Sequence, residues 1–364
     1  MYTLFSVCLI VILLSYLEYK GHIRHGLLLG FIILTIVMGI RFEYGNDYIS
    51  YSIKFVQNNN YSFSFSNLLN GDIEDPIWFL LNRLFEPLGF QWLVAFVTGV
   101  NSFAYYCLVK TELPSRLWPF GLFIYFFTAS FFPMELSMMR QGLAMALIVL
   151  AVPRIIDKEK LQPLLLLVLA MGIHSSALIC VPFILLLYLD FIKRKGIVAM
   201  AFVGLFVMFF VAKDFILNII SSTLNSFDVL EKFDDKYLLG GKYEASAAKS
   251  LFGLFMYFFP VVVCMKSLVS CHDERVIKYS ILYMFGTFLF LTDQIIPMIG
   301  RLAWYFTIFS IVALPFAFEA ISVKQLKLVL IIFFIMLTLK EYNDFFHADN
   351  WKGSFLHFKT IFDK

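Results

Sequence analysis

The sequence predicts an all-α, polytopic integral membrane protein with about twelve transmembrane helices. Hydrophobic residues make up 60% of the 364-residue chain and charged residues only 15%, whereas soluble domains average about 45–50% apolar and about 25% charged residues. The apolar residues gather in runs close to the length of about 20 residues that a membrane-spanning helix needs. We therefore expect one transmembrane domain over residues 1–364. The small net charge of +3 gives no indication of nucleic-acid binding.

Twelve apolar runs are the candidate helices. They cover residues 2–17, 26–41, 91–109, 117–133, 136–153, 161–173, 175–190, 197–213, 251–267, 279–297, 301–319 and 325–340. The first run has no basic segment before it and no small-residue cleavage site after it, so we expect a retained helix rather than a signal peptide. The five cysteines lie in or beside apolar runs without a C-x-x-C pair, which indicates packing residues rather than a disulfide framework or metal site.

Short basic loops set the predicted orientation, because lysine and arginine concentrate in cytoplasmic loops. Such loops contain Lys20 and Arg24, Lys110 and Arg116, Arg154 to Lys160, Lys193 to Lys195, Arg275 and Lys278, and Lys324 and Lys327. With these loops in the cytoplasm, the larger loops at 42–90 and 214–250 are predicted to lie on the outer, periplasmic side.

Residues 161–190 are predicted to form a helical hairpin. Basic loops flank both ends of this stretch, and both can be cytoplasmic only if the chain crosses the membrane twice. The apex then falls at Gly172–Ser176, with His174 on the outer side. Each arm is short for a full span, so the apex is expected to be recessed, which is tolerated where irregular backbone lines a cavity.

A short amphipathic helix is predicted after Pro76. Proline in a first helical turn, with acidic residues just before it, is a helix-start signal. Because the helix is short and has one apolar face, we expect it to lie along the membrane interface.

Four arginines stand at the ends of apolar runs, at Arg41, Arg83, Arg140 and Arg301. A charge near the bilayer core is costly and often marks a functional site, and the planar guanidinium matches phosphate. The predicted topology places Arg41, Arg140, Arg301 and His174 on one side of the membrane, which suggests a site for a lipid diphosphate. The structural alternatives are a snorkelling Arg41, a hydrogen-bonding role for Arg140, and an Asp293–Arg301 ion pair.

The other candidate site residues are polar or acidic neighbours of these arginines. His174 is the first candidate for a general base or hydrogen-bond donor, and Asp47 is the second candidate base. Contacts to other parts of the bound molecule are predicted for Tyr48, Glu74, Asp75, Gln141 and Tyr305. No P-loop, H-E-x-x-H, G-x-S-x-G or D-x-D motif is present, which argues against ATP-driven transport, metalloprotease or serine hydrolase chemistry and metal-dependent use of nucleotide sugars. No metal or cofactor is expected, because arginines can neutralise a leaving diphosphate.

These clusters resemble the EpsG/Wzy family of bacterial polysaccharide polymerases. The matching segments occur in the family's order and are residues 41–51, 74–84, 139–144 and 174–178, followed by Arg301 with Tyr305. The chain has Glu74-Asp75-Pro76-Ile77 where the family pattern resembles Glu-Pro-Gly-Phe, so either acidic residue could take the family role. The resemblance implies a metal-independent, GT-C-like helical bundle in the bacterial inner membrane, with its site facing the periplasm.

The resemblance also implies a reaction. A growing glycan on undecaprenyl diphosphate is transferred to the non-reducing end of a lipid-linked repeat unit, in O-antigen or exopolysaccharide synthesis. Arg140 and Arg301 would bind the donor diphosphate, and Arg41 would assist or bind that of the acceptor. The implied partners are these two lipid-linked oligosaccharides, membrane lipids and a chain-length regulator protein. The alternatives are an O-antigen-ligase-like transferase, a membrane O-acyltransferase, or, from another class, a lipid-linked oligosaccharide flippase or transporter.

Overall fold

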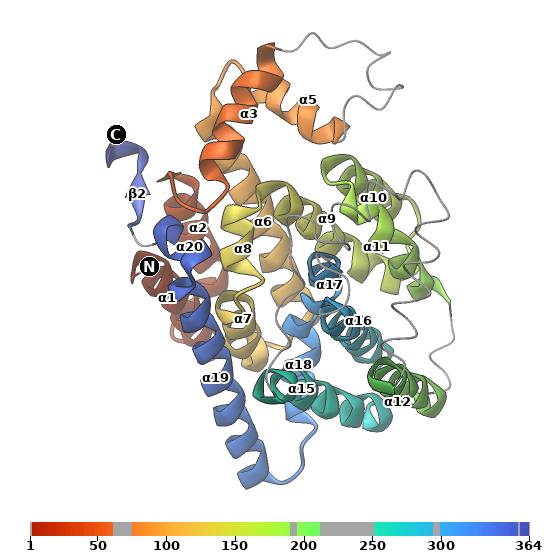
Figure 1. Cartoon of the computed structure of the whole chain (residues 1–364). Helices are drawn as coiled ribbons and strands as arrows, with labels where there is room; N and C mark the ends of the chain where they lie inside the picture. Colours follow the sequence, from red (N-terminus) through yellow and green to blue (C-terminus); the bar gives the residue numbers. More distant parts are fainter. Residues whose placement is uncertain are drawn as a thin grey trace, which may run out of the picture. The chain divides into compact units, whose positions relative to one another are not determined.

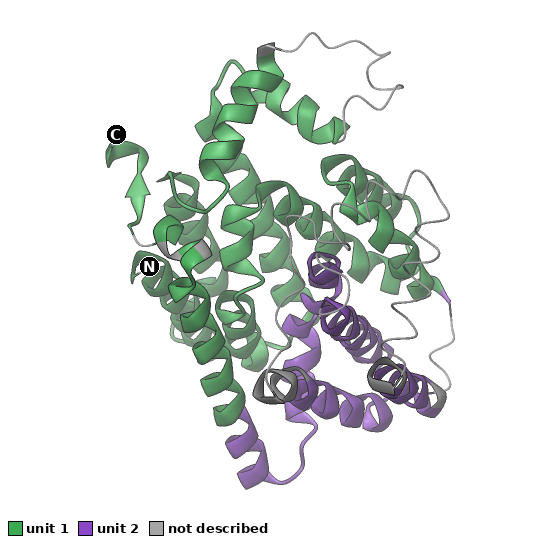
Figure 2. Cartoon of the chain, in the orientation of Figure 1, with its two compact units in different colours: residues 1–188, 332–364 green, residues 189–331 purple. Residues whose placement is uncertain are grey.

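The computed structural model describes residues 2–60, 75–189, 195–211, 251–293, 299–355 and 357–363 (Figure 1). These residues are almost entirely helical, and the strands among them are two residues long. The chain divides into two compact units, residues 1–188 with 332–364 and residues 189–331 (Figure 2). The single transmembrane domain over residues 1–364 stays a prediction. The whole of the predicted outer loop 214–250 lies outside the described residues.

The first unit contains the N-terminal helices and the C-terminal segment. Its elements are α1 (Tyr2–Tyr19), α2 (Gly26–Gly39), β1 (Arg41–Phe42), α3 (Tyr48–Asn60), α5 (Pro76–Phe85), α6 (Phe90–Glu112), η1 (Ser115–Leu117), α7 (Trp118–Phe127), α8 (Phe132–Ser137), α9 (Met139–Ile156), α10 (Leu161–Ile173), α11 (Ser176–Leu185), η2 (Leu186–Tyr188), most of α19 (Lys324–His347), α20 (Asp349–Phe355), β2 (Lys359–Thr360) and η4 (Ile361–Asp363).

The second unit is built from α12 (Lys195–Val211), α15 (Leu251–Ser270), α16 (Glu274–Thr292), α17 (Ile299–Thr307) and α18 (Ser310–Glu319), together with the first turns of α19. Helices α17 and α18 are bent by 56° at the break between them. The predicted continuous helix over 301–319 is therefore wrong at this point, because the chain turns at Ile308 and Phe309.

Three of the described helices, α1, α6 and α9, are long and apolar enough to cross a membrane, and the bent pair α17–α18 would add a fourth. Several further apolar helices, α2, α10 and α11 among them, are shorter. Helix α9 is the most enclosed of the three, with 83% of its apolar window buried against 28% for α1. The chain is thus a helical membrane protein, whereas about twelve spans and the GT-C-like bundle stay predictions.

The helix boundaries around residues 117–139 differ from the sequence prediction. The run 117–133 is interrupted, because α7 ends at Phe127 and the short α8 begins at Phe132, with Pro133 in its first turn. Helix α9 begins at Met139 rather than at residue 136, so Arg140 lies in its first turn.

Helix α3 was not predicted. Its residues were assigned to the loop 42–90 because they are largely polar. Tyr48, Tyr51 and Phe55 nevertheless recur at helical spacing, and all three are buried. It packs beside α5 (Figure 1), and α5 begins at Pro76 as predicted.

The predicted helical hairpin is confirmed. Helix α10 ends at Ile173, His174 is extended, and α11 begins at Ser176 and packs back against α10. The apex also contacts α5, because a Cβ placed on Gly172 would lie 2.5 Å from the Ile77 side chain. The helix after Pro76 therefore lies against the apex of the hairpin.

Substitution of two glycines of the second unit, Gly286 and Gly204, tests how its helices pack. A Cβ on Gly286 would lie 2.6 Å from the Thr307 nitrogen, whereas nothing lies within 4 Å of one on Gly204. We expect Gly286→Ala to destabilise the protein by about 1–3 kcal/mol through overpacking, and Gly204→Ala to be neutral. Thermal unfolding of both purified variants measures this, and equal melting temperatures would contradict the described α16–α17 contact.

Candidate functional site

An ion pair joins Arg140, in the first turn of α9, to Asp75, the residue that precedes α5. Nη1 of Arg140 donates to Oδ2 of Asp75, whose side chain is 7% exposed, while that of Arg140 is 26% exposed. The other carboxylate oxygen, Oδ1, accepts the backbone N–H of Ser175 at 2.9 Å. One carboxylate therefore connects the start of α5, the start of α9 and the apex of the α10–α11 hairpin.

The Arg140 guanidinium also lies over an aromatic ring. Its central carbon is 5.8 Å from the ring centroid of Tyr51 in α3, a separation at which cation–π attraction operates. The Tyr51 ring in turn packs edge-on against Trp78 of α5, at 5.7 Å. Arg140 is thus held from α5 by charge and from α3 by a ring face.

Burial and the charge of Arg140 act in opposite directions on the Asp75 carboxyl. Burial raises the pKa of the Asp75 carboxyl above its usual range, while the charge of Arg140 and the Ser175 N–H act in the opposite direction. We take Asp75 to be ionised, because its oxygen lies directly on a permanent cation. Diphosphate binding by Arg140 stays a prediction.

His174 caps the start of α11 with its ring. Nδ1 accepts the backbone N–H of Ser176 at 3.2 Å and lies 2.7 Å from the Ser176 hydroxyl. A ring nitrogen that accepts an N–H carries no hydrogen, so in neutral His174 the hydrogen is on Nε2. In this state Nε2 is a hydrogen-bond donor.

Asp47 lies at the start of α3 and is linked to the same cluster through the backbone. Its N–H donates to the Ser137 hydroxyl of α8 at 3.3 Å, and its carbonyl accepts the N–H of Tyr51 at 2.9 Å. Asp47 thus stands one helical turn before the ring beneath Arg140. Gln141, the residue after Arg140, is buried. Glu74 lies outside the described residues, so its environment cannot be compared with that of Asp75. Which of the two acidic residues has the role in the family pattern stays open.

Arg41 has a different environment from Arg140. Helix α2 ends at Gly39 rather than at residue 41, and Arg41 opens β1. Arg41 is 1% exposed, and its guanidinium donates from Nη1 to the Met38 carbonyl at 2.8 Å and to the Thr98 hydroxyl at 2.7 Å. The side chain therefore turns into the protein rather than toward headgroups. Diphosphate binding by Arg41 stays a prediction.

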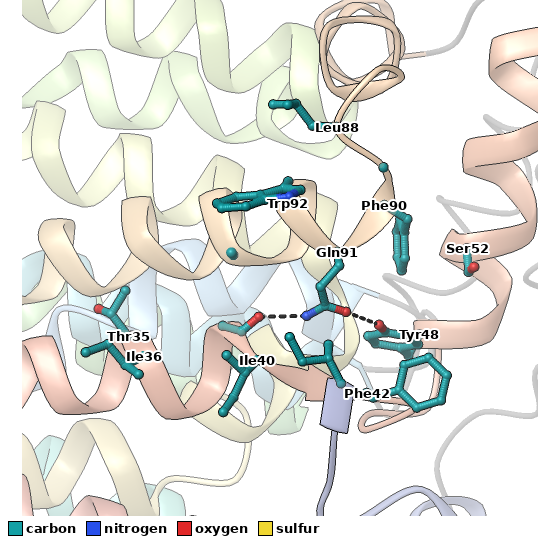
Figure 3. A pocket seen from close by; sticks show the side chains of 14 residues that line it. Thr35, Ile36, Ile40, Phe42, Tyr48, Ser52, Leu88, Phe90, Gln91 and Trp92 are labelled. Atoms are coloured by element: carbon teal, nitrogen blue, oxygen red, sulfur yellow. Dashed lines mark hydrogen bonds between the residues drawn. The ribbon is translucent and has the colours of Figure 1, made fainter. Parts of the chain in front are cut away.

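A cavity of about 710 Å³ lies beside the backbone of Arg41 (Figure 3). Gln91 is one of the residues that line the cavity. Its side-chain amide donates to the carbonyls of Gly39 at 2.7 Å and Arg41 at 3.1 Å, and its oxygen accepts from the Tyr48 hydroxyl at 2.9 Å. Most of the other lining side chains are apolar, Trp92 among them. Tyr48, one of the predicted contact residues, thus lies at a largely apolar cavity. Gln91 was missed, although a glutamine at the head of an apolar run is a detectable signal.

Arg301 and Tyr305 lie one turn apart on α17, in the second unit, and Tyr305 is fully buried. Asp293 accepts the backbone N–H of Gly300 at 2.9 Å and so caps the start of α17. The predicted convergence of Arg301 with Arg140 and His174 concerns two separate units and stays a prediction.

The comparisons with known proteins gave one family. A family model described as the EpsG family matches residues 26–353. No match to the chain was found among curated proteins or among solved structures.

Removal of the Asp75 charge tests the cluster. Asp75→Asn removes the negative charge beside Arg140, and the loss of a charge-assisted hydrogen bond to a partly buried cation should cost about 1–3 kcal/mol of stability. The control is Glu86→Gln, whose partner Arg83 lies 3.4 Å away in an exposed pair, where we expect about 0–1 kcal/mol. The measurement is thermal unfolding in detergent. Equal losses for both variants would show that Asp75 does not hold the cluster together.

Proposed function

The chain belongs to the EpsG family, and from this membership we propose that it is a polysaccharide polymerase of the bacterial inner membrane. In this proposal it transfers a growing glycan from undecaprenyl diphosphate to the non-reducing end of a lipid-linked repeat unit. The reaction belongs to O-antigen or exopolysaccharide synthesis and takes place on the periplasmic side without a metal ion.

The observation that carries the proposal is the Asp75 carboxylate between Arg140 and the backbone of Ser175. It brings together three of the segments that resemble the polymerases, although 65 residues separate Asp75 from Arg140 and 100 separate it from Ser175. A partly exposed arginine, an aromatic ring beside it and the histidine that precedes Ser175 are of the kinds that bind a diphosphate and a sugar.

The chemistry assigned to Arg140 is stabilisation of the leaving group. When the bond between the anomeric carbon and the diphosphate breaks, negative charge grows on the diphosphate oxygens. A fixed guanidinium near those oxygens stabilises the transition state more than the ground state. Arg301 is proposed to share this task, and Arg41 to assist with the acceptor lipid.

The acceptor hydroxyl attacks the anomeric carbon and loses its proton to a base, for which His174 and Asp47 are the candidates. As a base, His174 would have to move its hydrogen from Nε2 to Nδ1 and lose the Ser176 N–H bond. The geometry therefore favours a hydrogen bond from Nε2 to a phosphate or sugar oxygen, with Asp47 as the base.

Arg140→Lys tests the diphosphate contact. Lysine keeps the charge but lacks the planar fork, so we expect the polymerisation rate to fall by about 10²–10³-fold, with weaker donor-lipid binding. The control is Arg154→Lys at the other end of α9, where the arginine bonds Gln162 and the Leu150 carbonyl. Rates are measured as repeat units added by purified protein. Wild-type rates in Arg140→Lys would remove Arg140 from the site.

Two substitutions of His174 distinguish a role as hydrogen-bond donor from a role as general base. We expect His174→Ala to slow polymerisation by about 10²–10³-fold, and His174→Gln, whose amide can donate, to regain at least about tenfold of this. Donor-lipid binding should stay nearly unchanged in both, and the exposed His347→Ala should behave as wild type.

If the alanine and glutamine variants are slowed to the same extent, His174 acts as the general base instead. If neither the His174 nor the Arg140 variants alter polymer while the protein moves lipid-linked glycan across vesicles, the transporter function replaces the polymerase.

A further inference from the structure

The C-terminal segment of the chain is bonded to the loop that carries Asp47. We call Ser354, Phe355 and residues 357–363 the C-terminal strap; α20 ends in it and it contains β2 (Figure 1). Strand β2 pairs antiparallel with β1, with Thr360 opposite Arg41 and Lys359 opposite Phe42. The Ile361 N–H extends this pairing and donates to the Ile40 carbonyl at 3.0 Å.

Further contacts fix the loop that follows β1. The Gly45 N–H donates to the Ser354 carbonyl at 3.1 Å, and the Ser354 hydroxyl donates to the Asn46 side-chain oxygen at 3.0 Å. An ion pair of 3.0 Å joins Lys359 to Glu43. Because both ions of this pair are substantially exposed, the backbone bonds are the stronger part of the connection.

An aromatic clamp forms the centre of the connection. The Tyr44 ring is fully buried and packs edge-on against Phe355 at 5.2 Å and Phe358 at 5.0 Å. Edge-to-face pairs at such distances contribute beyond the area that they bury. The Tyr44 hydroxyl has no hydrogen-bond partner among the described residues, so the ring and not the hydroxyl makes the clamp.

Helix α8 holds the same loop from its other side. Gly45 has φ +107°, and a Cβ there would lie 2.6 Å from the Leu136 carbonyl oxygen, so only glycine fits. The Ser137 hydroxyl then holds the N–H of Asp47. The strap and α8 together set where α3 begins, and hence where the Tyr51 ring lies beneath Arg140.

We propose that the C-terminal strap is a positioning element of the transfer site, and that the positioning residues are Ile361 of the strap and Tyr44 of the loop that it contacts. They hold the loop 41–47 so that Asp47 stands one turn before Tyr51 and the Arg140 cluster. The transfer part of this inference rests on the proposed polymerase function. The matched family region ends at residue 353, so the strap begins where that match stops.

Two variants and two matched controls test the strap. Ile361 is the first residue of η4, a position where proline is tolerated, so Ile361→Pro mainly deletes the N–H that bonds Ile40. Its control is Phe362→Ala, at the neighbouring residue, which is 81% exposed. Tyr44→Ala removes the clamp, and Tyr44→Phe keeps it.

Hydrogen exchange of the full-length protein reads the geometry directly. We expect amides of residues 40–51 to exchange about two- to tenfold faster in Ile361→Pro, the factor that corresponds to the net loss of one backbone hydrogen bond. Exchange in α9 and α10 should stay unchanged, as should all exchange in Phe362→Ala and Tyr44→Phe. Unchanged exchange at residues 40–51 in Ile361→Pro would overturn the proposal.

Polymerisation rates then separate positioning from simple stability. We expect Ile361→Pro and Tyr44→Ala to lower the rate by about 10- to 100-fold, as a small misplacement of reacting groups does, with donor-lipid binding unchanged. Faster exchange with a wild-type rate would overturn positioning. Wild-type protein that makes no polymer would overturn the proposed function instead, and the exchange of residues 47–51 would still decide whether the strap positions α3.

Discussion

The carboxylate of Asp75 holds three segments of the first unit together. One oxygen binds Arg140 and the other accepts the Ser175 N–H, so α5, α9 and the hairpin apex meet at one side chain. A charge in a membrane protein's interior is costly, and a partly buried pair is stable only when further hydrogen bonds satisfy its oxygens. Both Asp75 oxygens have such a hydrogen bond, and the permanent cation of Arg140 stays partly exposed.

The contrast between Arg140 and Arg41 shows what suits an arginine to a ligand. The two look equivalent in the sequence, since each ends an apolar run beside glycine and polar residues. The Arg41 guanidinium is buried and donates hydrogen bonds to the Met38 carbonyl and the Thr98 hydroxyl. Arg140 is held by the Asp75 carboxylate and the Tyr51 ring and stays partly exposed. The first arrangement stabilises the joint between α2 and α6, and the second supports diphosphate binding in the proposed polymerase.

Local signals predicted much of the fold. The basic loops around 161–190 gave the hairpin, and Pro76 gave the start of α5. Contacts between distant residues could not be predicted, because nothing in one sequence shows that Asp75 meets Arg140 or that Thr360 pairs with Arg41. The break between α7 and α8 falls at Thr128, Ala129 and Ser130, with Pro133 just after it, but the run 117–133 is apolar enough overall to be predicted as one helix. The tautomer of His174 likewise depends on a hydrogen bond that only the folded backbone makes.

The most direct test of the central claim counts the leaving group. Purified protein in vesicles is given a lipid-linked repeat unit, and released undecaprenyl diphosphate and new glycosidic bonds are measured in the same samples. The account predicts one undecaprenyl diphosphate for each bond formed, and loss of both together when Arg140 is changed to lysine. Glycan that crosses the vesicle membrane without release of undecaprenyl diphosphate would contradict it.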